Sequence, residues 1–386
     1  MSGVRLRVLA LLTVSTVALA ACGSSPKTQG AGPAATGASP LVSSPSAIAS
    51  GRPSPSPKAS KKPAPAWKAG NPNGHATVPA AARAADTSHP TRVIGSGSAS
   101  SCTSQAVVAA VAAGGVITFN CGPDPVTITL KATAKVHNLT SRVVLDGGGK
   151  VTLSGGGVRR ILYMDTCDRG LGYAGGNCNE IQTPKLTVQN LTFTGGNATG
   201  QRTDGGDDGA GGGGAIFAHG GRLVVVNSRF LHNRCDSTGP DLGGAAVRIV
   251  FQERTPAYLV SSTFQGGICS NGGALSTLHA SWALINSIVT GNQAIGHGAN
   301  PARSGTPGGG SGGAVYSDGD RFTGLIAGSI VRGNVANEGG GAVFFVSNDR
   351  TGTLSIRSSS LSHNKSKTFE TDGLPGIFFL GSGRPY

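Results

Sequence analysis

The feature of this sequence that most constrains its fold is a phrase that recurs through its second half. "GGGGAIFAHGGRLVVVNSRFLHNRC" (211–235) joins glycines to two apolar runs, and similar phrases follow at 243–269, 272–292, 312–334 and 340–364. Aligned phrases share one apolar column, with an aliphatic column five residues earlier. The first column is Phe193, Phe230, Phe264, Val289, Val331 and Leu361, and the second is Val188, Val225, Leu259, Leu284, Ile326 and Ile356. Such matching positions predict stacked repeats.

Each repeat has the composition of short strands rather than helices. The apolar runs are rich in β-branched residues and end at Gly or Asn, which tolerate the left-handed backbone of tight turns. Small or polar turn formers lie three residues before the first column, at Asn190, Asn227, Ser261, Asn286, Gly328 and Ser358. We therefore expect an all-β solenoid of parallel strands with variable loops outside. The one helical segment, "SQAVVAAVAAGG" (104–115), is expected to cap its N-terminal end.

The repeats also carry a resemblance. Gly213-Gly214-Ala215-Ile216, followed by Phe230-Leu231-His232-Asn233, is similar to the GGAI and FxxN repeats of polymorphic outer membrane proteins. The segment from Cys102 through "GGVITFNCGPDPVTI" (114–128) resembles the N-terminal cap of bacterial right-handed parallel β-helix proteins, the fold of pectate lyases and polygalacturonases. The resemblance covers roughly residues 100–365. It implies a right-handed parallel β-helix of the pectin-lyase-like kind, and it implies no particular activity because this fold hosts enzymes and binding proteins.

The N-terminal quarter of the chain predicts export and anchoring. Arg5 and Arg7 precede an apolar stretch, and Leu19-Ala20-Ala21-Cys22 resembles the bacterial lipobox, so residues 1–21 are expected to be a lipoprotein signal peptide and Cys22 the lipidated residue. Residues 22–95 are rich in Pro, Ala, Ser and Lys, which predicts a disordered tether. Residues 96–386 would then be the folded domain, held at the outer face of the bacterial cell membrane through the lipid.

Six further cysteines predict three disulfides, as befits an exported chain. Cys235 and Cys269 both lie five residues after the first column, so they should meet on adjacent strands. The cap would be closed by Cys102 and Cys121, and a polar excursion at 164–180 by Cys167 and Cys178.

The charge of +14 does not indicate nucleic acid binding, because the basic residues are spread through the tether and form no cluster interleaved with aromatics in the repeats. The polar residues that we expect to bind a ligand lie instead in the loops before the Gly-Gly-Ala strands. Loops at one corner of a solenoid share one edge. The candidates are Asp207, Asp208, Asp241, His297, Arg303 and Glu338.

Carboxylates gathered on such an edge suit hydrogen bonding to sugars, and the predicted function is binding of extracellular or cell-wall polysaccharide. A polysaccharide lyase or glycoside hydrolase of the same fold is one alternative, and an adhesion or structural module that recognises protein is another. The carboxylate and Gly-His-Gly spacing of polygalacturonases is absent, so no catalytic constellation is identified. No cofactor is required, although Asp204, Asp207 and Asp208 offer oxygen ligands that Ca²⁺ prefers.

Overall fold

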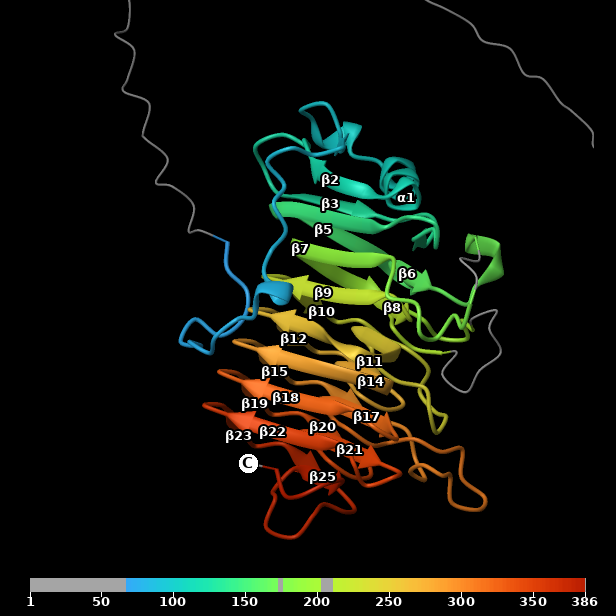
Figure 1. Cartoon of the computed structure of the whole chain (residues 1–386), viewed down its shortest axis with the longest axis vertical. Coiled ribbons are helices and arrows are strands. Elements are labelled where there is room, and N and C mark those ends of the chain that lie inside the picture. The colour runs from blue at the N-terminus through green and yellow to red at the C-terminus, as the bar shows by residue number, and fades with distance from the viewer. Residues whose placement is uncertain (1–66, 173–175, 203–210, 386) are drawn as a thin grey trace, which may run out of the picture. The chain divides into compact units, whose positions relative to one another are not determined.

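The computed structural model describes residues 67–172, 176–202 and 211–385, and these residues form an all-β protein of parallel strands. Figure 1 shows the strands stacked in sequence order, from helix α1 at one end to strand β25 at the other. The first strands are β1 (Arg92–Ile94), β2 (Gly115–Phe119), β3 (Val126–Thr129), β4 (Ala134–Lys135) and β5 (Arg142–Arg159). Three short 3-10 helices also occur, at Ala80–Ala82, Ala99–Ser101 and Arg169–Leu171.

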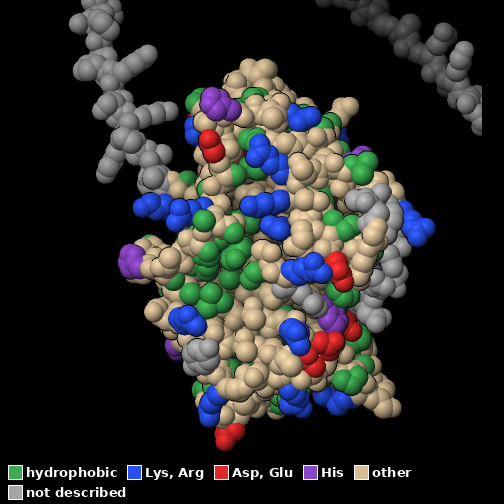
Figure 2. Space-filling model, viewed as in Figure 1, with side chains coloured by type: hydrophobic (Ala, Val, Ile, Leu, Met, Phe, Trp, Pro, Cys, Tyr) green, Lys and Arg blue, Asp and Glu red, His purple; other side chains and the backbone are tan. Residues whose placement is uncertain are grey.

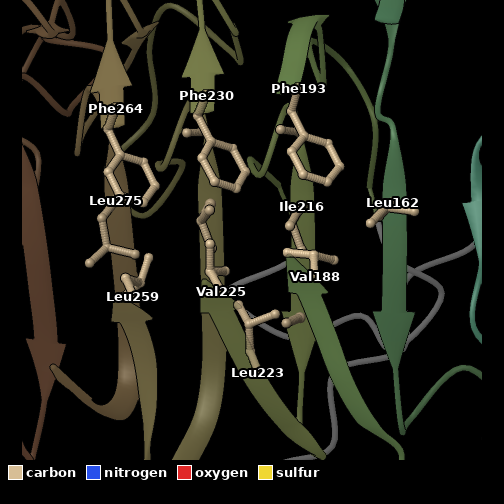
Figure 3. Close-up of a cluster of buried hydrophobic side chains, with 14 of the residues drawn as sticks. Leu162, Val188, Phe193, Ile216, Leu223, Val225, Phe230, Leu259, Phe264 and Leu275 are labelled. Atoms are coloured by element: carbon tan, nitrogen blue, oxygen red, sulfur yellow. The ribbon is translucent and has the colours of Figure 1, made fainter. Parts of the chain in front are cut away.

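The first apolar column of the sequence forms the core of one set of strands. These strands are β7 (Lys185–Gly196), β10 (Arg229–Leu231), β12 (Thr263–Gln265), β15 (Ile288–Thr290), β19 (Ile330–Arg332) and β23 (Ser360–Ser362). Their register pairs the column residues in order, from Phe193 with Phe230 to Val331 with Leu361. The rings of Phe193, Phe230 and Phe264 stack with centroids 4.9 and 4.8 Å apart (Figure 3). The predicted alignment of the repeats is therefore confirmed.

The second column lies on the strands that precede these, which are β9 (Arg222–Val226), β11 (Val247–Val260), β14 (Leu275–Ile285), β18 (Thr323–Ala327) and β22 (Thr353–Arg357). Val188 on β7 pairs with Val225, and Leu259, Leu284, Ile326 and Ile356 continue the row. A small separate sheet contains β13 (Ile268–Cys269), β16 (Gln293–Ala294), β20 (Val335–Ala336) and β24 (Lys365–Ser366).

A third set of strands is formed mostly by those that follow the Gly-Gly-Ala turns. It runs through β6 (Leu162–Asp165), β8 (Ile216–His219), the first halves of β11 and β14, β17 (Val315–Gly319), β21 (Val343–Ser347) and β25 (Ile377–Leu380). Leu162, Ile216 and their counterparts face the main core. Because side chains alternate along a strand, the residues between them face the other way, and we call that side the outer face.

The expected capping helix is α1 (Ser104–Ala113). The Oγ1 atom of Thr103 accepts a hydrogen bond from the Ala106 N–H at 3.2 Å, which satisfies one free donor of the first turn. Val107 and Val111 are buried against the first strands. The disulfides join Cys102 to Cys121, Cys167 to Cys178 and Cys235 to Cys269, the three pairs that the sequence predicts.

The end of the predicted tether packs on the repeats instead of extending from them. The N–H of Ala69 donates to Asn227 Oδ1 at 3.0 Å, and Ala76 exchanges two hydrogen bonds with the Asn286 side chain. Ala82 is fully buried in an apolar cluster with Val260, Ala283 and Ile285. Residues 67–95, which the sequence analysis assigns to the tether, thus include a described segment that contacts the repeats.

The packing of this segment on the repeats has a local physical reason. Asn227 and Asn286 adopt positive φ angles of 45° and 52°, as the turn prediction requires. Their side chains are thereby presented to the outside of the turn, where they satisfy the backbone of a passing segment. A chain with few apolar residues can be held in this way, because its backbone polar groups find partners in the repeats. Residues 1–66, with the predicted signal peptide and Cys22, lie outside the described residues.

Candidate functional site

The outer face carries two rows of side chains that cross the strands in register. The first row is Tyr163, Phe217, Arg248, Ser276, Tyr316, Phe344 and Phe378. The second row, two residues further along each strand, is Asp165, His219, Val250, Leu278, Asp318, Val346 and Leu380. Aromatic and ionisable groups are therefore concentrated on one side of the third set of strands.

A hollow lies at the C-terminal half of this face. We call it the acidic groove. It has a volume of about 540 Å³, and its lining includes Asp241, Asn300, Asp318, Phe344, Phe369 and Phe378. Figure 2 shows acidic side chains grouped near the position that β17 occupies in Figure 1. The groove thus combines carboxylates, an amide and phenyl rings in one concave site.

Two carboxyl groups of the groove are joined through one amide. The Nδ2 atom of Asn300 lies 2.8 Å from Asp241 Oδ1 and 3.1 Å from Asp318 Oδ2. The hydroxyl of Tyr316 donates to Asp318 Oδ2 at 3.0 Å. Asp241 comes from the loop before one Gly-Gly-Ala strand, Asn300 from a later loop and Asp318 from β17, so three distant segments build the pair.

Burial raises the pKa of Asp318, and the nearby negative charge of Asp241 adds to this effect, while hydrogen bonds from Tyr316 and Gly319 oppose it. The strand register explains the burial, because the neighbours of Asp318 in its row are Leu278 and Val346. Tyr316 is fully buried, and burial raises the pKa of its hydroxyl well above the usual value. Asp318 is therefore the carboxyl group of the groove that is best suited to hold a proton.

Phenyl rings form the other wall of the groove. Phe344 stacks on Tyr316 with centroids 5.0 Å apart and on Phe378 at 5.1 Å. Phe369, from the loop after β24, meets Phe378 edge to face at 4.9 Å. Phe369 and Phe378 are half-buried, so parts of their rings remain open to a ligand.

Three of the predicted ligand-binding residues bind each other. Glu338 is buried, and its carboxylate accepts hydrogen bonds from both terminal nitrogens of Arg303, at 3.0 and 2.8 Å, and from the Gly298 N–H at 2.8 Å. The Nδ1 atom of His297 lies 3.3 Å from Glu338 Oε1. Burial alone would raise the pKa of Glu338, but the hydrogen bonds and charge of Arg303, together with the contact from Gly298, lower it.

This cluster fixes the loop at 297–309, which carries Asn300 into the groove. It serves to position the loop, and none of its three members lines the groove. Of the predicted residues, Asp241 lines the groove, whereas Asp207 and Asp208 lie outside the described residues, as does Asp204.

Sequence reasoning missed Asn300, Tyr316 and the phenyl rings of the groove, and it left Asp318 out of the candidate set. The amino-acid sequence does contain one signal of these residues. The motif Tyr-x-Asp occurs on two Gly-rich repeats, at Tyr163-Met164-Asp165 and Tyr316-Ser317-Asp318. In both, the tyrosine hydroxyl donates to its own aspartate, at 2.9 and 3.0 Å, and its ring stacks on a phenylalanine of the next repeat.

The site at Tyr163 and Asp165 includes a cluster of possible metal ligands. One ligand atom each from Asp165, Cys167 and His219 lies within 4.8 Å of the others. However, Cys167 is bonded to Cys178, and a disulfide sulfur is not the thiolate that metals bind. Two ligand atoms remain, which is too few for a structural zinc site. The residues predicted to offer oxygen ligands to calcium, at 204–208, lie outside the residues that the structure describes.

No protein-family model, no curated protein and no solved structure matches this chain. Within the described ranges, no helix has the length and apolar character needed to cross a membrane.

Proposed function

We propose that this chain is an exported protein that binds extracellular or cell-wall polysaccharide in the acidic groove. The observation that carries the proposal is the composition of the groove wall. Asp241, Asn300 and Asp318 supply hydrogen-bonding groups that suit sugar hydroxyls. Opposite them, Phe369 and Phe378 offer flat apolar surface for the C–H face of a sugar ring. Concave sites with an apolar lining and a few fixed polar groups are typical of ligand sites.

The finer description of the fold belongs to the same proposal. Parallel strands stacked in register support a right-handed parallel β-helix of the pectin-lyase-like kind, which the repeats resemble. Three disulfides support an exported location, since such bonds persist in oxidising compartments. Lipidation of Cys22 and retention at the outer face of the membrane complete the proposed arrangement.

Glycoside hydrolysis is the second candidate function, and the pKa of Asp318 favours it. Hydrolysis of glycosides uses one protonated carboxyl group as an acid and one carboxylate as a base or nucleophile. Asp318, whose pKa is raised, would donate the proton to the leaving oxygen. Asp241 shares Asn300 with it and would be the partner carboxylate.

The test measures retention of the purified mature chain on a panel of acidic and neutral polysaccharides, and counts new reducing ends in parallel. We expect Phe369→Ala and Asp318→Asn each to weaken retention about tenfold or more. Asp124→Asn and Leu139→Ala are matched controls, because both residues are exposed and neither lines the groove. Reducing ends that vanish in Asp318→Asn would establish hydrolysis.

Two outcomes would contradict the proposal. Retention that is equal in the variants and the parent would place the sugar site elsewhere. Failure of the parent to hold any glycan of the panel would remove polysaccharide binding as the function of the groove.

A further inference from the structure

The three disulfides differ in their surroundings. Cys102, Cys121, Cys235 and Cys269 are buried. The sulfur atoms of Cys102, Cys235 and Cys269 contact backbone carbonyl oxygens. Cys167 and Cys178 are both half-exposed. They close the excursion that leaves the repeats after β6, and their Cα atoms are 5.1 Å apart. Only this pair, among the described cysteines, combines solvent access with a neighbouring ionisable side chain.

That side chain is His219. Its Nε2 atom lies 3.6 Å from the Cys167 sulfur and 2.7 Å from Asn179 Oδ1. Its Nδ1 atom lies 3.1 Å from Asp165 Oδ1. Both ring nitrogens thus face oxygen atoms, and the protonated imidazole is the form that donates to both. The ring is nearly buried, at 3% exposure, so its orientation is set by these contacts.

Asp165 is itself held in its charged form. Burial alone would raise its pKa, but the hydrogen bond and charge of His219, with hydrogen bonds from the Cys167 N–H and the Tyr163 hydroxyl, lower it. These contacts connect four groups in order: the Tyr163 hydroxyl, the Asp165 carboxylate, the His219 ring and the Cys167 sulfur. Arg160 and Asp168 are the other charged groups that interact electrostatically with Tyr163.

We infer from this geometry that the Cys167–Cys178 bond is a thiol–disulfide exchange site, in which His219 assists the departure of Cys167. The inference is independent of the polysaccharide proposal. A disulfide opens when a thiolate attacks one sulfur and the other leaves as a thiolate, and a better-stabilised leaving group leaves faster. An adjacent imidazolium stabilises a cysteine thiolate.

The chemical steps balance with a small external thiol as the reductant. The thiolate of this reductant attacks the Cys178 sulfur and forms a mixed disulfide, while the electron pair of the broken S–S bond goes to Cys167. His219 then gives its Nε2 proton to the Cys167 sulfur. A second thiolate attacks the mixed disulfide, which releases the oxidised small disulfide and leaves Cys178 as a thiolate that takes a proton from water. Two thiols are oxidised and the protein disulfide is reduced by two electrons.

A polar cavity gives the reductant a way in. It has a volume of about 290 Å³ and is lined by Asn177, Asn179, Glu180, Gln182, Phe251 and Arg254, which include the residues on either side of Cys178. The exposed ion pair of Arg254 with Glu180, at 3.0 Å, lies at this cavity. Phe251 also stacks against the His219 ring, with centroids 5.5 Å apart. The cavity therefore lies beside the segment that carries Cys178.

The experiment measures how fast reduced glutathione opens each disulfide of the full mature chain at pH 7. Newly formed thiols are alkylated at set times and assigned by peptide mapping. We expect Cys167–Cys178 to open at least about tenfold faster than Cys102–Cys121 in the same molecules. In His219→Gln this advantage should fall about tenfold. His75→Gln, at an exposed histidine of the N-terminal segment that packs beside Asn286, is the control and should leave the rate unchanged.

Because His219 is nearly buried, Asp165→Asn gives a second variant that keeps the imidazole and removes its carboxylate partner, and it should slow the opening as well. In addition, the alkylation rate of the reduced Cys167 thiol should show a titration below the usual value of about 8.5 for a free cysteine. Equal opening rates for all three disulfides would overturn the inference. So would a fast opening that is unchanged in folded His219→Gln, since exposure alone would then explain it.

Discussion

The two Tyr-x-Asp sites of the outer face share a motif and differ in chemistry. Tyr163 and Tyr316 each donate to an aspartate two residues later, and each stacks on a phenylalanine of the next repeat. Yet the pKa of Asp165 is lowered and that of Asp318 is raised. The local motif is therefore not what sets the charge of the carboxyl group.

The difference comes from the next strand in register. Asp165 pairs with His219, whose ring nitrogen lies 3.1 Å from the carboxylate. Asp318 pairs with Val346, an aliphatic residue that buries the carboxyl group without donating to it. Desolvation disfavours a charged carboxylate and an adjacent imidazolium favours it. The residue at one position of the neighbouring repeat thus decides whether the pKa of the carboxyl group is lowered, as at Asp165, or raised, as at Asp318.

Among substitutions at the two Tyr-x-Asp sites, we expect the largest change in stability at Asp165. Asp165→Asn removes the partner of a buried histidine, and we expect the free energy of unfolding at pH 7 to fall by about 3 kcal/mol. Because the folded-state pKa of Asp165 is lowered, its contribution is present above the unfolded value of 3.8 and is lost as the pH falls through the folded-state pKa. Urea unfolding of both proteins at pH 7 and pH 3 measures this, with Asp124→Asn as the exposed control. A pH-independent difference would contradict it.

A smaller loss of stability is expected at Glu338, whose contacts position the loop that carries Asn300 into the groove. Glu338→Gln keeps the shape of the side chain but loses its charge, so the hydrogen bonds from Arg303 and the Gly298 N–H weaken. We expect a loss of about 1 kcal/mol in stability, the value of roughly one hydrogen bond. Glycan retention should weaken several-fold because Asn300 is less well placed. Thermal unfolding and retention measured together test this, and retention that stays at the parent level would show that the cluster does not position the groove.

Asp318→Asn should act in the opposite direction to Asp165→Asn on stability. A raised folded-state pKa means that the folded protein resists ionisation, so Asp318 costs stability once the pH rises above the unfolded value of 3.8. The variant should equal the parent at pH 3 and exceed it by up to about 1 kcal/mol at neutral pH. Urea unfolding across this range provides the measurement, and a variant less stable than the parent at pH 7 would be evidence against a protonated Asp318.

The smallest and sharpest change is Val346→His, which places an imidazole at the position that His219 occupies beside Asp165. Val346 is half-buried, so the larger ring has room at the surface. We expect the pKa of Asp318 to fall, since a protonated imidazole favours the carboxylate. Titration of the aspartate carboxyl carbons by NMR measures the shift, and Val346→Gln controls for added bulk and polarity. An Asp318 pKa that is the same in both variants would show that register alone does not set it.

Much of the architecture was predictable because periodicity is a local property. The two apolar columns, the turn asparagines and the partners of Cys235 and Cys269 follow from positions repeated along the chain, and the strand register confirms them. The contacts of the segment after residue 67 were not predicted, because its low apolar content indicates disorder and partners such as Asn286 lie more than two hundred residues away.

The candidate site was predicted less well, because its contacts also join residues that are distant in sequence. The sequence places Asp241, His297, Arg303 and Glu338 on one edge, but it does not say which of them face a ligand. Glu338 satisfies its charge with Arg303 at the base of a loop, and that contact withdraws both from the groove. Asn300 enters the groove instead, although an asparagine in a loop carries no sequence signal of its own.

The sequence by itself determined that this chain stacks parallel β-repeats, which side chains form the core and that Cys235 pairs with Cys269, because each depends on a pattern repeated from one unit to the next. The tertiary structure alone decided which polar groups meet. Loop lengths vary between repeats, and the neighbours of each strand in register are residues distant in sequence. Asp165 therefore lies beside His219, and Asp318 between Leu278 and Val346. Burial and charge at those contacts then set the chemistry of two otherwise identical motifs.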